Sequence, residues 1–147
     1  MNFDVTKILI LLVSLSGGFV ASATPSRPPP ETFDVEGFTD VYAFDLGCFN
    51  GTADAKVNVV SSASTEATLK PDYNRAEALL LLGGAAVQPE SDDQPVVTGS
   101  ANLVTATIDK DVDCATYASA VVKGKGEHRA KRNGKTVDRV SEATLTK

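Results

Sequence analysis

The sequence predicts an all-β domain built as a sandwich of two sheets, with one disulfide and at most one short helix. Three observations indicate this fold class. Val, Ala, Thr and Ser are abundant and tryptophan is absent, a composition that favours strands and small-residue packing. Several short segments alternate apolar with polar side chains, as half-buried strands do. Finally, the chain has only two cysteines, and they lie far apart in the sequence, as expected for a bridge between distant strands.

The first 23 residues predict a secretory signal peptide. Lys7 precedes an apolar run that extends to about Val20, and the small residues Ala21, Ser22 and Ala23 suit cleavage by a signal peptidase. Because this run is short and rich in Gly and Ser, and no second run of spanning length follows, we expect no membrane span in the mature chain. The protein is therefore predicted to be secreted and extracellular.

The mature chain is predicted to be a Pro-rich linker over residues 24–36 followed by one domain over residues 37–147. Pro25, Pro28, Pro29 and Pro30 favour an extended backbone in the linker. In an oxidising compartment the isolated cysteine pair predicts a disulfide between Cys48 and Cys114. A bridge that closes a loop of this length contributes about 4 kcal/mol in the chain-entropy model.

The pattern along the domain predicts strands at residues 41–48, 55–61, 96–108 and 114–122. Residues 61–65 are small and polar without a period, and residues 89–95 form an acidic loop. Residues 72–82 are ambiguous, because four consecutive leucines suit either a helix or a central strand. We predict one short helix there, since Pro71-Asp72 suits a helix start and Gly83-Gly84 a helix end, and we keep the strand as the alternative.

The C-terminal segment predicts a β-hairpin with its register. Asn133-Gly134 lies between two extended runs, which is the strongest short hairpin signal. A two-residue turn there pairs Arg132 with Lys135 and Ala130 with Val137. The same register pairs Arg129 with Asp138 and Lys125 with Glu142, so that opposite charges meet on one face.

The wide cysteine separation and the C-terminal hairpin resemble immunoglobulin-like domains in general architecture. The chain has no tryptophan to pack on the bridge, and Val112 stands two residues before Cys114 where a tyrosine corner would have Tyr. We therefore predict the sandwich architecture and no family membership.

Charge is distributed unevenly along the chain. Residues 24–122 carry 15 acidic and 5 basic side chains, whereas residues 123–147 carry 8 basic and 3 acidic ones. The best functional candidate is a set of cations on the hairpin, predicted to bind an anion: Lys123, Lys125, Arg129, Lys131, Arg132 and Lys135. Concentrated cations suit phosphates, sulfated glycans or other polyanions. We expect no nucleic acid, because aromatic side chains that would stack on bases are missing from this set.

Other residues predict no catalytic or metal chemistry. Asp109, Asp111 and Asp113 alternate like the start of a calcium loop, but Cys114 and Ala120 stand where that loop needs Gly and Glu. His128, the single histidine, is expected at the hairpin surface beside Arg129 rather than as a catalytic base. We therefore predict no metal and no cofactor.

One modification site is predicted. Asn50-Gly51-Thr52 is the only N-glycosylation triplet, so Asn50 is an acceptor in a host that has the machinery.

These observations favour a secreted, non-enzymatic binding or interaction module with an unidentified extracellular partner, which a basic hairpin would contact if that partner is anionic. Two alternatives remain. One is a small extracellular hydrolase that uses carboxylates such as Asp45, Asp109 or Asp111 as acid and base. The other is a structural component of an extracellular layer, with the Pro-rich segment as a spacer.

Overall fold

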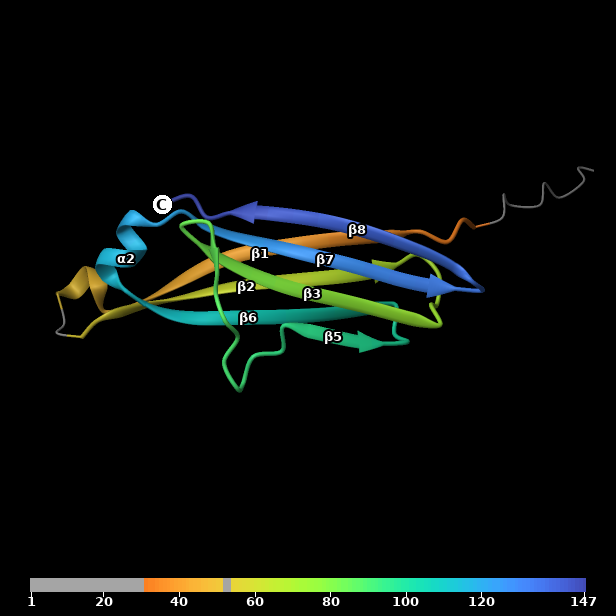
Figure 1. The fold of residues 1–147 in the computed structure, drawn as a ribbon, viewed down its shortest axis with the longest axis horizontal. Helices are drawn as coiled ribbons and strands as arrows, with labels where there is room; N and C mark the ends of the chain where they lie inside the picture. The colour runs from red at the N-terminus through yellow and green to blue at the C-terminus, as the bar shows by residue number, and fades with distance from the viewer. Residues whose placement is uncertain (1–30, 52–53) are drawn as a thin grey trace, which may run out of the picture. The chain divides into compact units, whose positions relative to one another are not determined.

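The computed structural model describes residues 31–51 and 54–147, and the fold within Glu31–Lys147 is a sandwich of two antiparallel sheets (Figure 1). The three-stranded sheet has the order β1-β2-β6, and the five-stranded sheet has β4 and β5 paired with β3, followed by β7 and β8. The first sheet consists of β1 (Val35–Leu46), β2 (Lys56–Ala67) and β6 (Leu103–Asp113). The second consists of β3 (Tyr73–Leu82), β4 (Ala85–Ala86), β5 (Val96–Gly99), β7 (Val122–Arg132) and β8 (Lys135–Thr144).

The predicted fold class is confirmed, including its general architecture. Strands β1, β2 and β6 face strands β3, β7 and β8, which matches the partition of strands A, B and E against C, F and G in immunoglobulin-like sandwiches. The predicted signal peptide and residues 24–30 of the predicted linker lie outside the described residues. The rest of that linker includes folded chain, because Phe33 is buried and β1 begins at Val35.

In the three-stranded sheet the inner positions are filled by small side chains. Strand β2 is longer than predicted, because Ser61, Ala63 and Thr65 continue the inward alternation that Val57 and Val59 begin. Ser61, Ala63 and Thr65 are small or polar, so a hydrophobicity pattern does not reveal this two-residue period. All five side chains are nevertheless buried. The adjacent strand β6 alternates as well, with Val104, Ala106 and Ile108 inward.

The predicted helix over residues 72–82 is wrong. This segment is β3, paired with β7 from Tyr73↔Lys131 to Leu82↔Val122. Asn74, Ala76, Ala78 and Leu80 are buried between the sheets while their neighbours are half-buried. A strand is more stable than a helix here, because its two-residue period buries one set of side chains against the facing sheet. This tertiary stabilisation exceeds the weak preference of the local sequence for a helix.

Two further boundaries differ from the predictions. The strand predicted over residues 96–108 is divided into β5 and β6 by a turn at residues 100–102, and β6 continues to Asp113. The strand predicted from Cys114 is instead a short helix, α2 (Cys114–Ser119), before β7 begins at Val122. Asp113 caps this helix, because its carboxylate accepts a hydrogen bond from the Thr116 backbone N–H at 2.8 Å.

The predicted hairpin and its register are confirmed. Strands β7 and β8 pair Arg132 with Lys135, Ala130 with Val137, Arg129 with Asp138 and Lys125 with Glu142. The pairing runs without a bulge from Lys123↔Thr144 to the turn, where Asn133 and Gly134 both adopt positive φ angles.

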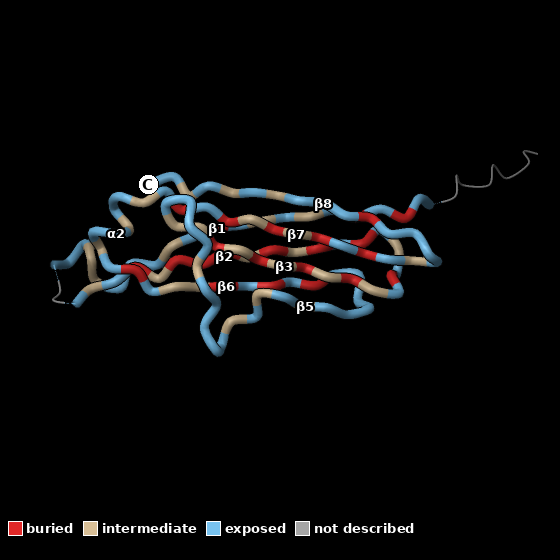
Figure 2. Tube along the Cα trace, in the orientation of Figure 1, coloured by how far each residue is buried: buried red, intermediate tan, exposed pale blue. Residues whose placement is uncertain are grey.

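The core between the sheets consists of Val, Ala, Leu and Ile, and buried positions follow β2, β3, β6 and β7 (Figure 2). Of the four phenylalanines in the described residues, only Phe33 is buried, whereas Phe38, Phe44 and Phe49 are exposed. The interior is therefore made of small side chains, and the large aromatic ones are at the surface. Among the described residues, no helix has the length and apolar character that crossing a membrane requires.

Candidate functional site

The six predicted anion-binding residues divide into a row and a tip. Lys123, Lys125, Arg129 and Lys131 occupy alternate positions of β7, and the intervening positions are buried, so these four side chains lie on the outer face. The row from Lys123 to Lys131 is about 26 Å long at roughly 3.3 Å per residue. Arg132 and Lys135 face each other at the end of the hairpin.

The middle of the row is neutralised within the protein. Lys125 Nζ lies 3.1 Å from Glu127 Oε1, and Arg129 Nε donates a hydrogen bond to Asp138 Oδ1 at 2.5 Å. The hydrogen bond to Asp138 and the negative charge of that carboxylate raise the pKa of Arg129. These two cations have acidic partners already, so the row carries less unpaired positive charge than the sequence suggested.

The hairpin tip has a larger excess of positive charge. Lys131 Nζ lies 5.7 Å from the centre of the Tyr73 ring, a contact that leaves its N–H donors free. The Asp72 backbone N–H donates to Lys131 O at 2.8 Å, and Asp72 Oδ2 accepts from Asn133 N at 2.7 Å. These bonds hold the turn before β3 against the hairpin tip, and Lys70, which is exposed, lies two residues before Asp72 in the chain. The sequence pattern missed Lys70 because it is far from the hairpin in the chain.

A pocket of about 340 Å³ lies at this tip, lined by Glu31, Phe33, Leu69, Arg132, Asn133 and Lys135. Two cations of the predicted set therefore share one pocket with two apolar side chains. In the described residues no acidic side chain lies within ion-pair distance of Arg132. Lys135 Nζ donates to Phe33 O at 2.7 Å, and an ammonium group has two further hydrogens to donate.

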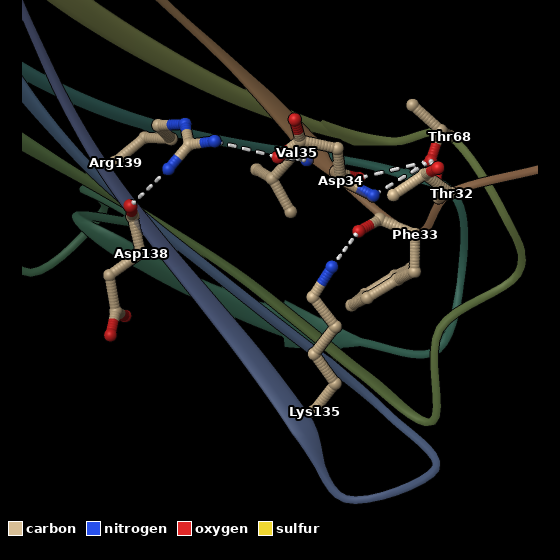
Figure 3. A network of polar contacts seen from close by, with 8 residues as sticks. All are labelled: Thr32, Phe33, Asp34, Val35, Thr68, Lys135, Asp138 and Arg139. Carbon is tan, nitrogen blue, oxygen red and sulfur yellow. Dashed lines mark hydrogen bonds and ion pairs between the residues drawn. The ribbon is translucent and has the colours of Figure 1, made fainter.

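Figure 3 shows how the residues beside this pocket are held. Asp34 N donates to Thr68 Oγ1 at 2.9 Å, and Arg139 Nη2 donates to Asp34 Oδ1 at 2.7 Å (Figure 3). Together with the Lys135 contact, these bonds connect the segment before β1 with β8 and with the residue after β2. The pocket wall that Phe33 provides is thus fixed by polar contacts on both sides.

The expectation of a surface His128 is wrong, because the side chain is 2% exposed between the sheets. His128 Nδ1 lies 2.9 Å from Thr65 Oγ1, and His128 Nε2 lies 2.7 Å from Ser141 Oγ. Since the Thr65 hydroxyl donates to Arg75 O at 2.8 Å, it accepts from Nδ1–H, and Nε2 accepts from Ser141. Burial lowers the pKa of His128, which favours this neutral form.

Space for this imidazole is made by glycines. A Cβ at Gly37 would lie 2.2 Å from His128 Cδ2, and a Cβ at Gly126 would lie 2.6 Å from His128 Nε2. Gly126 therefore leaves room for the imidazole, in a strand that has no bulge there. The odd-and-even pattern of the hairpin already places His128 on the same face as Val122 and Ala130, which is the signal that could have identified it as buried.

The Ser141–His128 contact has the geometry of an activated serine, but it lacks the rest of an acyl-transfer site. Thr65, rather than a carboxylate, orients the imidazole. Ser141 Oγ is also engaged by Thr39 Oγ1 at 2.6 Å, so β1 covers it. None of the four pockets described here is lined by Ser141. The contact therefore has a structural role: His128 and Ser141 lie in one sheet, and their bonds to Thr65 and Thr39 connect it to the other sheet.

The predicted disulfide is present, and Cys48 and Cys114 have a Cα–Cα distance of 5.6 Å. In immunoglobulin domains the bridge joins the two sheets through the core. Here Cys48 begins the 3₁₀ turn η1 (Cys48–Asn50) after β1, and Cys114 begins α2 after β6, so the bridge joins the ends of the two outer strands of one sheet. A pocket of about 490 Å³ lies beside it, lined by Cys48, Phe49, Cys114, Tyr117, Ala118 and Lys147.

Asn50 is exposed at the end of η1 and is accessible for glycosylation, and Gly51 follows with a φ of 66°. Thr52, the third residue of the predicted glycosylation triplet, lies outside the described residues.

The carboxylates of the hydrolase alternative lie on open surface. Asp45 accepts hydrogen bonds from the backbone N–H groups of residues 47–49. Asn58 Nδ2 donates to Asp109 Oδ2 at 2.9 Å and to Asp111 Oδ1 at 3.0 Å on the outer face of the sheet. A hydrolase would need these groups in a cleft, and none of the four described pockets is lined by Asp45, Asp109 or Asp111.

Asp93 and Asp109 form a second carboxylate contact. Burial acts to raise the pKa of Asp93, but backbone hydrogen bonds from Glu90 and Asp109 lower it on balance. The Asn58 amide acts to lower the pKa of Asp109, whereas the Asp93 carboxyl and burial outweigh it, so the pKa of Asp109 is raised. Within the described residues, no three His, Cys, Asp or Glu side chains come together to hold a metal ion.

Comparison with known proteins adds no functional information. No known family matches the chain, and no curated protein sequence does. Among solved structures, a protein from Archaeoglobus fulgidus is similar at 12% identity over 77% of this chain and 98% of that one, with a TM-score of 0.30. A similarity of this size carries no argument about fold or function.

Proposed function

We propose that this protein is a secreted, non-enzymatic binding module that contacts an anionic partner through its hairpin tip. The observation that carries the proposal is the tip pocket, in which Arg132 and Lys135 lie beside Phe33 and Leu69. Cations that adjoin apolar side chains suit an anionic group attached to an organic skeleton, such as a sulfated or carboxylated glycan.

The charge around the pocket supports the same partner. Lys131, Arg132 and Lys135 belong to the tip, and exposed Lys70 precedes the turn that is bonded to it, whereas the acidic residues of this region are Glu31 and Asp72. One of these acids, Asp72, already accepts a hydrogen bond from Asn133. The tip therefore differs from the middle of β7, where acidic and basic side chains alternate and compensate each other.

Export is supported by the predicted signal peptide and by the cysteine pair. A structural disulfide is rare in reducing compartments and common in secreted domains. Intact mass of the protein recovered from the medium, with and without reduction, would measure both the cleavage site and the bridge. Loss of residues 1–23 and a mass gain of two hydrogens on reduction are expected.

The test of the binding function is the affinity for heparin, a polysulfated probe, measured by titration at several salt concentrations. Lys131→Ala combined with Arg132→Ala should weaken binding about tenfold and make it less salt-dependent, since two cationic contacts are lost. The matched control is Lys56→Ala combined with Lys110→Ala, which removes the same charge from the other sheet. This control should change the affinity less than about twofold.

Equal weakening by both double variants would show that only net charge matters and would contradict the assignment to the tip. Unchanged binding after the Lys131 and Arg132 substitutions would contradict it as well. Because these side chains are at the surface, the unfolding free energy of each variant should stay within about 0.5 kcal/mol of the wild type.

A further inference from the structure

The outer face of β1 carries a row of large apolar side chains that the rest of the fold does not cover. Phe38 is 52% exposed, Tyr42 40%, Phe44 56% and Leu46 53%, all on the face opposite the core. The rings of Tyr42 and Phe44 lie edge to face with centroids 5.4 Å apart. Contiguous exposed apolar surface of this kind marks an interaction site in monomeric proteins.

The same strand also has an unpaired edge. Within the described residues β1 pairs with β2 alone, so alternate residues direct backbone N–H and C=O groups away from the sheet (Figure 1). Natural edge strands are usually short, interrupted by proline or protected by lysine. Strand β1 is 12 residues long, and Val35–Leu46 contains neither proline nor a basic residue.

The other edges of the sandwich are protected. Strand β8 carries charged side chains along its length, including Lys135, Asp138 and Arg139. On the free side of β6, Gln94 forms two backbone hydrogen bonds with Thr107, at 2.9 and 3.1 Å. Strand β4 has only two residues. Strand β1 is therefore the long open edge of the described fold.

The charge on this face defines the side chains that a partner would bring. Strand pairing and alternation place six acidic residues and one basic residue on the outer face of the three-stranded sheet, a net charge of −5. The acidic ones are Glu36, Asp40, Glu66, Asp109, Asp111 and Asp113, and the basic one is Lys56. Apolar and acidic side chains alternate directly on β1, where Asp40 lies between Phe38 and Tyr42.

We propose that β1 is a strand-addition edge for an extended segment of another protein whose side chains are apolar and cationic. Backbone hydrogen bonds to the free edge of β1 would supply much of the affinity. Apolar side chains of the incoming strand would pack beside Phe38, Tyr42 and Phe44, and its Lys or Arg side chains would pair with Glu36 and Asp40.

Charge excludes a second copy of this chain as the natural occupant. Antiparallel pairing of two β1 strands would bring acidic Glu36, Asp40 and Asp45 of both copies to one seam with no basic residue among Val35–Leu46. Like charges on paired strands destabilise the pair. A foreign cationic segment removes this repulsion.

The test uses the secreted, disulfide-bonded protein and a fluorescent ten-residue probe with Thr at every second position and Lys and Val in turn at the others, so that Lys and Val lie on one face of the extended peptide. Binding is measured by fluorescence anisotropy at low and physiological salt. Three control peptides separate the contributions: Glu in place of each Lys, the same residues in two blocks, and a probe with alternate backbone nitrogens methylated to remove the ladder hydrogen bonds. Each control should bind at least tenfold more weakly than the probe.

Two protein variants locate the site. Phe38→Lys with Phe44→Lys introduces the cations that protect natural edges, and it should weaken binding of the probe at least tenfold. Leu103→Lys with Val140→Lys is the matched control, because these apolar side chains are 55% and 62% exposed but lie off β1. It should change the affinity less than about twofold.

Several results would overturn the proposal. Equal binding of the methylated probe would exclude strand addition, and equal binding of the block peptide would reduce the effect to net charge. No binding of the unmodified probe at millimolar concentration would exclude strand addition as well. Self-association that Phe38→Lys with Phe44→Lys abolishes would assign β1 to a second copy. Binding of a neutral oligosaccharide, lost in the same variant, would assign it to a glycan.

Discussion

His128 lies between the two sheets and takes part in the hydrogen bonds that connect them. Its ring spans from Thr65 on one sheet to Ser141 on the other strand of its own hairpin, and Ser141 in turn contacts Thr39 of β1. Because Thr65 uses its hydrogen on Arg75 O, Nδ1 of the imidazole carries a hydrogen, and the neutral ring accepts from Ser141 at Nε2. A proton on Nε2 would reverse that bond, and Ser141 would then have to donate to Thr39 Oγ1 instead.

Stability should consequently depend on pH through His128. Burial lowers the pKa of His128 below its ordinary value of 6.5, so the unfolded chain binds a proton more readily than the folded one. The unfolding free energy should be constant above about pH 6.5 with respect to this group and should fall as the pH decreases below it, by at most about 1.4 kcal/mol per pH unit. Urea denaturation at pH 7.5 and 5.5 would measure this fall.

His128→Gln is the control variant, because the amide keeps a donor and an acceptor but does not titrate. Its unfolding free energy should change less than that of the wild type between the same two pH values. An identical change in both proteins would assign the effect to other groups.

Two hydroxyl groups on the inner face of β2 provide a matched comparison. Both Ser61 and Thr65 are fully buried. The Thr65 hydroxyl has partners on His128 and Arg75, whereas among the described residues the Ser61 hydroxyl has none. Thr65→Val should lower the unfolding free energy by about 1–3 kcal/mol, because it leaves polar groups without partners.

Ser61→Ala should leave the unfolding free energy unchanged or raise it by up to about 1 kcal/mol, since it removes a hydroxyl that is already unsatisfied. Chemical denaturation of the two variants measures both effects. A similar loss of stability in Ser61→Ala and Thr65→Val would mean that Ser61 has a partner in solution.

Among the secondary-structure elements, the hairpin could be predicted from sequence and β3 could not. The hairpin carries its own turn signal at Asn133-Gly134, and its charge pairs agree with the register that this turn sets. Strand β3 has four consecutive leucines and no alternation at its end, so its two-residue period exists only in the burial that the facing sheet imposes. The information that decides such a segment is tertiary.

The strand assignment of β3 predicts unequal roles for adjacent leucines. Leu80 is fully buried in the core, whereas Leu79 is half-buried on the outer face opposite Lys125. Leu80→Ala should lower the unfolding free energy by about 2–5 kcal/mol. Leu79→Ala should lower it by about 1 kcal/mol, since less apolar surface is removed from water there. Equal losses at the two positions would contradict the alternation.

For the whole molecule, the sequence was sufficient to predict two sheets, one disulfide and an excess of cations near the C-terminus. It did not indicate which of these cations have partners within the protein. The ion pairs of Lys125 and Arg129 and the bond from Lys135 to Phe33 depend on strand pairing and packing. It also missed the exposed aromatic row, since large apolar residues in a strand are normally assigned to the core.

Removal of the disulfide should destabilise the whole fold without changing its architecture. Cys48→Ser combined with Cys114→Ser should lower the unfolding free energy by about 2–4 kcal/mol, since the open chain regains conformational entropy. Hydrogen exchange should increase first at η1 and α2, which the bridge holds together. An unfolding free energy equal to that of the oxidised wild type would contradict this expectation.

The position of the bridge also has a mechanical consequence. The start of the coloured chain before β1 and the C-terminus lie at opposite ends of the described fold (Figure 1), so a stretching force between them acts along the strands and loads β1 and β8 in shear. If the strands separate under force, the disulfide still prevents the chain between Cys48 and Cys114 from extending, a sequence separation of 66 residues. That segment would otherwise add roughly 220 Å of length. Under tension the oxidised protein therefore extends less than the reduced protein, and reduction of the disulfide would release that additional length.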